Sequence, residues 1–118
     1  MVKNTDCIKE KTDGKSMTVI LSGELDHHNA VKFRTEIDGL IQSRKPKILI
    51  LDVEHIDFMD SSGLGLIMGR YSLMQKLGGA FALRNPNERI VKIFELAGLS
   101  RIVRIENDSE EVKNESEQ

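Results

Sequence analysis

Residues 47–65 read KILILDVEHIDFMDSSGLG, an apolar run followed by an acid, two serines and two glycines. The first part, 47–53, is almost continuously apolar, which is typical of a parallel strand covered on both faces. Residues 54–60 are more polar and are predicted to form a loop. Apolar residues then return at three- and four-residue spacing, which predicts a helix from about Ser61 to the stop signal Gly78-Gly79. A strand, a loop and a helix in this order form the building unit of an α/β sheet.

The segment before this unit predicts a hairpin and a first helix. Residues 5–10 and 17–22 are strand-like, and Asp13-Gly14 between them favours a tight turn, so the two strands are expected to pair antiparallel. Asp26 then has the side chain of a helix cap. Apolar residues at helical spacing follow it as far as Ser43.

The segment after this unit predicts a further strand, helix and strand. Residues 80–84 read as a short strand, and Asn85-Pro86 is predicted to cap the next helix, with the proline at its first position. An amphipathic stripe follows and ends before Gly98. Residues 101–105 alternate between charged and apolar side chains, which predicts an edge or final strand.

These elements predict a single α/β domain over residues 1–106. Its fold class is a mixed, mostly parallel β-sheet of about four to five strands flanked by helices. Residues 107–118 are acidic and contain one large apolar residue, so they are predicted to be a disordered tail.

Composition excludes several classes of function. The formal net charge is −2, and the aromatic residues are four phenylalanines and one tyrosine, so neither a nucleic acid nor a membrane surface is an expected partner. Cys7 is the only cysteine, which excludes an intrachain disulfide and a thiolate metal cluster. No apolar run has the length of a signal peptide or a membrane span, so a cytoplasmic location is expected.

The histidines and glycines do not form a recognisable metal or nucleotide motif. His27 and His28 are adjacent and would diverge by about 100° on a helix, while His55 stands alone, so no metal site is predicted. Gly63, Gly65 and Gly69 have a different spacing from a dinucleotide-binding fingerprint. Each glycine inside a helix costs about 1 kcal/mol relative to alanine, which indicates close contact with either the sheet or a partner.

The two serines admit an enzymatic and a non-enzymatic interpretation. Ser61 or Ser62 could be the nucleophile of a serine hydrolase, because a strand, a loop and a serine at a helix start also build a nucleophile elbow. However, the context is not Gly-x-Ser-x-Gly, Asp60 would oppose an oxyanion, and no histidine follows the serines in the chain.

In the non-enzymatic interpretation, the serines cap the helix or accept a phosphate. A helix N-terminus favours added negative charge by about 0.3–1 kcal/mol, and a phosphoserine carries roughly −1.5 to −2 charges. The fold would tolerate this charge, whereas a partner docked there through apolar or acidic groups would not. These arguments do not choose between Ser61 and Ser62.

Two motifs, GELDHHNA at 23–30 and FMDSSGLGLIMGRY at 58–71, closely resemble the anti-sigma factor antagonists of the STAS domain family, sporulation type. The resemblance extends through GGAFALRNP and IFELAGLSRIVRI and covers nearly the whole predicted domain. It implies a small α/β domain that binds an anti-sigma factor, which is also a serine kinase, and so releases a sporulation sigma factor. It also implies that this kinase phosphorylates the antagonist with its own bound ATP, and that a PP2C-type serine phosphatase reverses the modification.

The resemblance also assigns roles to residues. Matched to the motif, the phosphate acceptor is Ser61, the serine directly after Asp60. The chain itself is then expected to have no catalytic residue and no cofactor. The expected partner-binding residues come from the motif and from the end of the second strand, which topology places near the same surface: Glu24, Asp26, His27, His28, Asp60, Ser62, Gly63 and Leu64.

Overall fold

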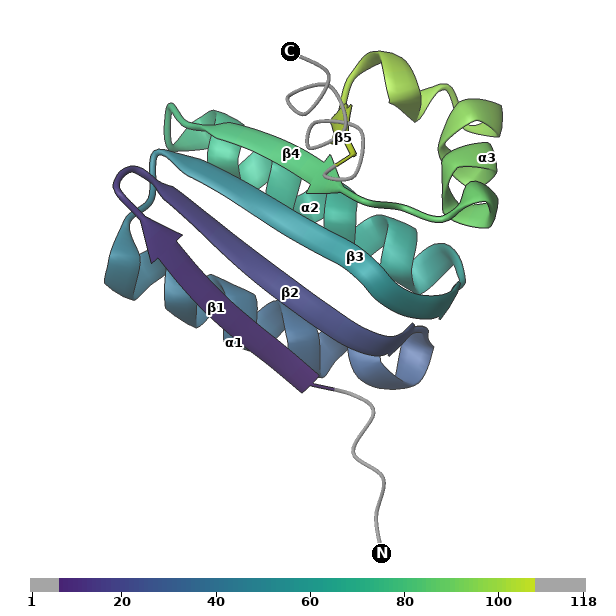
Figure 1. The fold of residues 1–118 in the computed structure, drawn as a ribbon, viewed down its shortest axis with the longest axis horizontal. Helices are drawn as coiled ribbons and strands as arrows, with labels where there is room; N and C mark the ends of the chain where they lie inside the picture. Colours follow the sequence, from purple (N-terminus) through teal and green to yellow (C-terminus); the bar gives the residue numbers. More distant parts are fainter. Residues whose placement is uncertain (1–6, 108–118) are drawn as a thin grey trace, which may run out of the picture.

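The computed structural model describes residues 7–107, which form a five-stranded sheet in the order β1-β2-β3-β4-β5 (Figure 1). The β1 strand pairs antiparallel with β2, and the other neighbouring strands pair in parallel. The mixed, mostly parallel sheet expected from the sequence is thereby confirmed. The strands are β1 (Cys7–Asp13), β2 (Ser16–Leu25), β3 (Ile48–Met59), β4 (Ala80–Arg84) and β5 (Arg104–Glu106).

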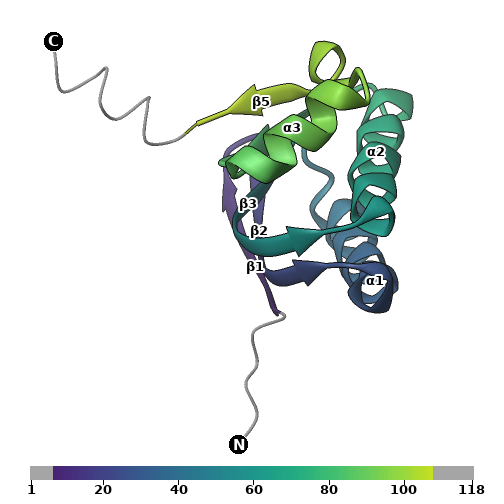
Figure 2. The ribbon, with the colours of Figure 1, turned by 90° about the vertical axis from the view of Figure 1, so that its right-hand side faces the viewer.

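The helices connect the parallel strands. Figure 2 shows α1 and α2 side by side on one face of the sheet, as expected when crossover connections of one handedness follow each other. A short 3-10 helix, η1, leads into the last strand. The bounds are α1 (His27–Arg44), α2 (Ser61–Lys76), α3 (Glu88–Leu96) and η1 (Leu99–Arg101).

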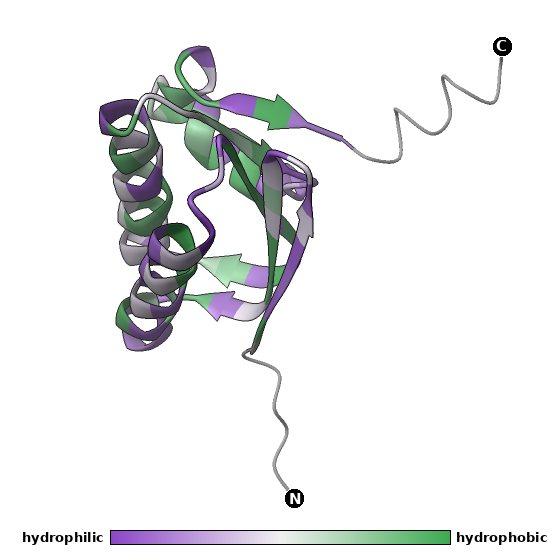
Figure 3. Cartoon of the chain, turned by 90° about the vertical axis from the view of Figure 1, so that its left-hand side faces the viewer, coloured by the Kyte–Doolittle hydropathy of each residue, from purple (hydrophilic) through white to green (hydrophobic). Residues whose placement is uncertain are grey.

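The core lies between the sheet and these helices. Alternate residues of β2, from Met17 to Leu25, are buried, whereas those between them are partly or fully exposed. Hydrophobic and hydrophilic residues also alternate along α1 and α2 (Figure 3), and Phe33 and Ile37 of α1 are completely buried. Each such side chain contributes about 1.5–3 kcal/mol by leaving water, so this apolar stripe fixes α1 on the sheet.

The loop predicted over residues 54–60 is wrong, because β3 continues to Met59. Two register shifts against β2 interrupt the regular pairing of β3. Along this part of β3, Glu54 and His55 are exposed one after the other, as are Asp57 and Phe58, so the sequence loses the alternation that normally identifies a strand. The longer strand carries the chain to the end of β2, where Leu25 pairs with Met59.

Two boundaries near the C-terminal end also differ from the prediction. The cap of α3 is Asn87, whose Oδ1 accepts a hydrogen bond from the Ile90 N–H at 2.9 Å, and not Asn85. The Asn85 N–H instead donates to the carbonyl of Glu106, which extends the pairing of β4 with β5. The last strand covers three residues, because η1 occupies the start of the predicted 101–105 strand.

Two parts of the sequence interpretation lie outside the described residues. They are positions 5 and 6 of the first predicted strand and the acidic tail at 107–118, of which only Asn107 is described. Within residues 7–107, the helices are too short or too polar to cross a membrane.

Candidate functional site

The parallel pairing of β2 with β3 brings the first residues of α1 and α2 together. Each helix begins directly after its strand, at the same edge of the sheet, and the Asp60 N–H donates to the Leu25 carbonyl at 3.3 Å. The residues predicted from the motif and those predicted from the end of the second strand therefore lie at one site. Their common location is a consequence of topology, because the carboxyl ends of parallel strands meet at one edge.

Asp60 joins the two helices through its carboxylate. Its Oδ1 accepts from the Ser62 N–H at 2.8 Å, and its Oδ2 accepts from the His27 N–H at 3.2 Å. Desolvation raises the pKa of Asp60, but backbone hydrogen bonds from Ser62, His27 and Gly63 outweigh it and hold the pKa below its ordinary value. The carboxylate is thus kept ionised as the cap of α2 and as a second acceptor at the start of α1.

The entry to α1 is fixed by two further polar side chains. Asp26 caps this helix, with its Oδ1 accepting from the Asn29 N–H at 3.0 Å. Asn29 is buried, and its Nδ2 donates to the Glu24 carbonyl at 3.1 Å, which holds the turn between β2 and α1. Sequence reasoning missed Asn29; the available signal was an asparagine one turn before the buried Phe33.

The serines differ in exposure. Ser61 is the first residue of α2 and is exposed, whereas Ser62 is half-buried. Neither side chain makes a hydrogen bond within residues 7–107, so the Ser61 hydroxyl is accessible to a reagent from outside. Glu24, His27 and His28 are also exposed near this helix start, and Leu64 is half-buried.

The glycines of α2 serve two purposes. A Cβ on Gly63 would collide with the Leu25 carbonyl oxygen and would lie 2.6 Å from Met59 Cγ, so this position is pressed against the sheet. A Cβ on Gly65 or Gly69 would meet nothing within 4 Å. The sequence left contact with the sheet and contact with a partner open; the sheet explains Gly63 only.

The geometry does not assemble a hydrolase. No hydrogen bond joins a histidine side chain to Ser61 or Ser62 in the part of the chain that the structure describes, and backbone N–H groups already occupy both Asp60 oxygens. In that same part, no group of three or more His, Cys, Asp or Glu side chains is arranged to hold a metal ion.

Comparison with known proteins adds sequence relatives. A family model described as the STAS domain matches residues 7–112. An anti-sigma F factor antagonist of Paenibacillus polymyxa is 40% identical over 89 residues, covering 75% of this chain and 76% of that protein. An anti-sigma-B factor antagonist of Bacillus subtilis (strain 168) is 33% identical over 101 residues, covering 85% of this chain and 90% of that protein.

Solved structures show the same fold. The anti-sigma factor antagonist SpoIIAA in its unphosphorylated form matches with a TM-score of 0.73 at 27% identity, over 95% of this chain and 98% of that chain. The Bacillus cell fate determinant SpoIIAA in its phosphorylated form matches with a TM-score of 0.69 at 28% identity, over 92% and 98%.

Proposed function

The chain belongs to the STAS domain family, and we propose that it is an anti-sigma factor antagonist of the sporulation type, switched off by phosphorylation at Ser61. Anti-sigma factor antagonists of this family are regulatory binding proteins and not enzymes. The chain binds an anti-sigma factor in the cytoplasm and thereby releases the sigma factor. The same anti-sigma factor is a serine kinase that transfers the γ-phosphoryl group of its own ATP to Ser61, and a PP2C-type phosphatase removes it.

The position of Ser61 carries this proposal. The side chain is exposed at the first position of α2, where Asp60 holds the helix start against α1. Ser62, in contrast, is half-buried. The exposure therefore favours the serine that the family motif also selects.

A phosphate at Ser61 would change the surface without changing the fold. The positive end of the helix dipole at the start of α2 favours a negative charge by about 0.3–1 kcal/mol. The same group adds roughly −1.5 to −2 charges beside Asp26 and Asp60. An anti-sigma factor that meets this surface through apolar or acidic groups is then repelled. Both forms of SpoIIAA resemble this chain with similar TM-scores, which fits a modification that leaves the fold in place.

The test uses the anti-sigma F factor of Paenibacillus polymyxa as a defined probe. Wild-type chain is incubated with this protein and ATP, and the modified residue is mapped by mass spectrometry. Phosphate is expected on Ser61 in wild type and in Ser62→Ala, and on no residue in Ser61→Ala. Transfer to Ser62, or to neither serine, would contradict the proposed switch.

Binding of the same variants tests the charge mechanism. Ser61→Ala is expected to bind like wild type, and Ser61→Asp at least about tenfold more weakly, which corresponds to roughly 1.4 kcal/mol. Isothermal calorimetry measures both affinities, and thermal unfolding verifies that both variants fold. Equal affinity of Ser61→Asp and wild type would exclude charge as the cause of release.

A further inference from the structure

A groove of about 390 Å³ lies between α1 and α2, next to the helix start that carries the serines. Ser62, Gly65 and Gly69 line it from α2, together with Arg70, and Arg34 faces it from α1. Its volume suits a side chain of another protein, and its position makes it continuous with the Ser61 surface.

The glycines leave the floor of this groove open. Gly65 and Gly69 lie inside α2, where each costs about 1 kcal/mol of helix stability relative to alanine. A close approach of α1 or of the sheet would explain them, but an added Cβ at either position meets nothing within 4 Å. The packing of the chain itself therefore does not require them, whereas a partner inserted between the helices would.

Arg70 presents a buried cation to the groove. It is 9% exposed, and its Nε lies 3.2 Å from Asp38 Oδ1, so the two form an ion pair. The pair is not aligned for a hydrogen bond, and neither Nε nor Nη1 of Arg70 has a hydrogen-bond partner within residues 7–107. A buried guanidinium that is only partly compensated is costly. Nε and Nη1 are themselves covered by the chain, but the Arg70 side chain as a whole is 11% exposed and lines the groove.

Arg34 adds a second positive charge. It is exposed and forms no ion pair in the described part of the chain. Burial lowers the pKa of Arg70, and the charge of Arg34 lowers it further, while Asp38 opposes both effects. Two guanidinium groups thus line the groove, and no carboxylate is among its lining residues in the described part of the chain. Asp38, which pairs with Arg70, lines the larger cavity instead.

We propose that this groove receives the carboxylate of an Asp or Glu side chain of the anti-sigma factor, seated over Gly65 and Gly69 and bound by Arg34 and Arg70. The planar donors of arginine match both oxygens of a carboxylate, and a carboxylate would add the negative charge that Asp38 supplies only in part. Leu66 and the exposed Val31 line the same groove and suit the apolar stem of such a side chain. The inference rests on the proposed function for the identity of the partner, and it adds the chemistry by which that partner is recognised.

Variants that block the groove separate partner binding from folding. Gly69→Leu fills the open floor, and Gly39→Leu is the matched control, since Gly39 also lies in a helix with nothing within 4 Å of an added Cβ but does not line the groove. With the Paenibacillus polymyxa anti-sigma F factor as probe, Gly69→Leu is expected to weaken binding at least about tenfold and Gly39→Leu to leave it unchanged. The unfolding midpoints of both variants are measured alongside.

Charge exchange tests the carboxylate. Arg34→Gln is expected to weaken binding without loss of stability, and Arg70→Lys, which keeps the charge but loses the planar fork, to weaken it as well. Each acidic residue on the surface of the anti-sigma F factor is then changed to lysine, one at a time. The affinity of each such variant for the Arg34→Glu chain is measured. One such reversal is expected to restore affinity with Arg34→Glu while weakening binding to wild type.

The outcomes distinguish this inference from the proposed function. Wild-type affinity in all groove variants would overturn the carboxylate site and leave the antagonist function standing. A loss of phosphorylation without a loss of binding would also overturn it, because the arginines would then serve the phosphate of ATP. No binding by the wild-type chain itself would overturn the antagonist function, and the groove would lose its proposed occupant with it.

Discussion

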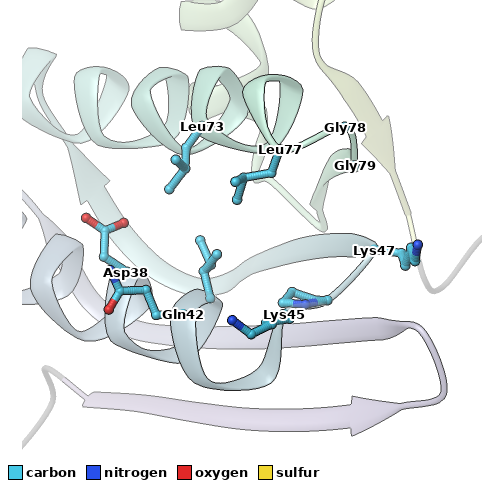
Figure 4. A pocket seen from close by; sticks show the side chains of 10 residues that line it. Asp38, Gln42, Lys45, Lys47, Leu73, Leu77, Gly78 and Gly79 are labelled. Carbon is cyan, nitrogen blue, oxygen red and sulfur yellow. The ribbon is translucent and has the colours of Figure 1, made fainter.

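The two ends of the α1–α2 pair differ in how the helices are held together. At the N-terminal end, the Asp60 carboxylate accepts a hydrogen bond from the first turn of each helix. At the C-terminal end, Leu73 of α2 and Leu77, the residue after α2, lie across a cavity of about 560 Å³ from Gln42 of α1 and from Lys45, the residue after α1 (Figure 4). No side-chain hydrogen bond joins the helices there within residues 7–107. The larger of these two hollows is thus at the end without the motif.

Both ends nevertheless use a glycine pressed against backbone. Gly63 contacts the end of β2, and a Cβ on Gly79 would lie 2.7 Å from both the Lys47 carbonyl oxygen and Met74 Cε. Gly65 and Gly69 between them are open. Of the five glycines in or just after α2, Gly63 and Gly79 are pressed against backbone, while Gly65, Gly69 and Gly78 have open space around them.

The largest effect on stability is expected at the N-terminal end of the α1–α2 pair. Gly63→Ala places a Cβ against the Leu25 carbonyl and Met59, which belong to the core and cannot move freely, so it should destabilise the fold by about 1–3 kcal/mol. Gly65→Ala, two residues later, should instead stabilise it by up to about 1 kcal/mol. Chemical denaturation of both variants measures the difference, and equal effects would contradict the division of the glycines.

A smaller loss of stability is expected at the C-terminal end of the α1–α2 pair. In Gly79→Ala, one of the two obstructing atoms is the flexible tip of Met74, which can turn away, while the Lys47 carbonyl stays in place. Destabilisation of about 1 kcal/mol is expected, at the low end of the range for overpacking. Urea unfolding beside Gly63→Ala checks the order, and a greater loss at Gly79 would reverse the comparison of the two ends.

Acid should act on the N-terminal end through Asp60. Its pKa is lowered below the ordinary value of 3.8, so the stabilisation it gives is complete above that value and is lost as the pH falls through the lower, folded-state pKa. Asp60→Asn should therefore remove part of the acid sensitivity of unfolding below pH 3.8.

The amide resonance of His27 gives a local measurement of the same event. In wild type it should shift as Asp60 is protonated, and in Asp60→Asn it should not. Glu10→Gln is the control: the Arg44 side chain lowers the pKa of Glu10 far from the motif, so this variant should leave the His27 response intact. A His27 amide that is insensitive to acid in wild type would contradict the link between the helices.

The smallest effect is expected inside the larger cavity. Leu77 is 62% exposed, so Leu77→Ala removes little buried surface and should change stability by less than about 0.5 kcal/mol. Its affinity for the anti-sigma factor should equal that of wild type. A loss of binding in this variant would show that the C-terminal end is also part of the interface.

The sequence predicted most of the fold, because local signals define most of its elements. The apolar run at 47–53 and the helical spacing after Ser61 depend on neighbouring residues alone, and both predictions are confirmed. The end of β3 was missed since its two register shifts are set by pairing with β2, which is distant in the chain. The cap of α3 was misplaced for the same reason, as β5 determines the conformation at Asn85.

The candidate site was predicted in part. The motif and the topology were sufficient to bring Asp26 and Asp60 to one edge of the sheet. The groove between the helices was not predicted, because Arg34 and Arg70 belong to different helices and no local pattern relates them. Only the packing of α1 against α2 shows that Arg70 is buried and that Arg34 lies beside the same groove.

The Asp60 carboxylate, which accepts hydrogen bonds from both α1 and α2, affects how an enzyme could recognise Ser61. The serine lies next to an aspartate whose two oxygens are engaged by helices from separate parts of the chain. A short synthetic peptide with the sequence MDSSGLG would contain Ser61 but neither the His27 N–H nor the neighbouring helix. For the phosphorylation proposed at Ser61, we therefore expect recognition to require the folded domain, so that a chain whose sheet has not formed is not modified.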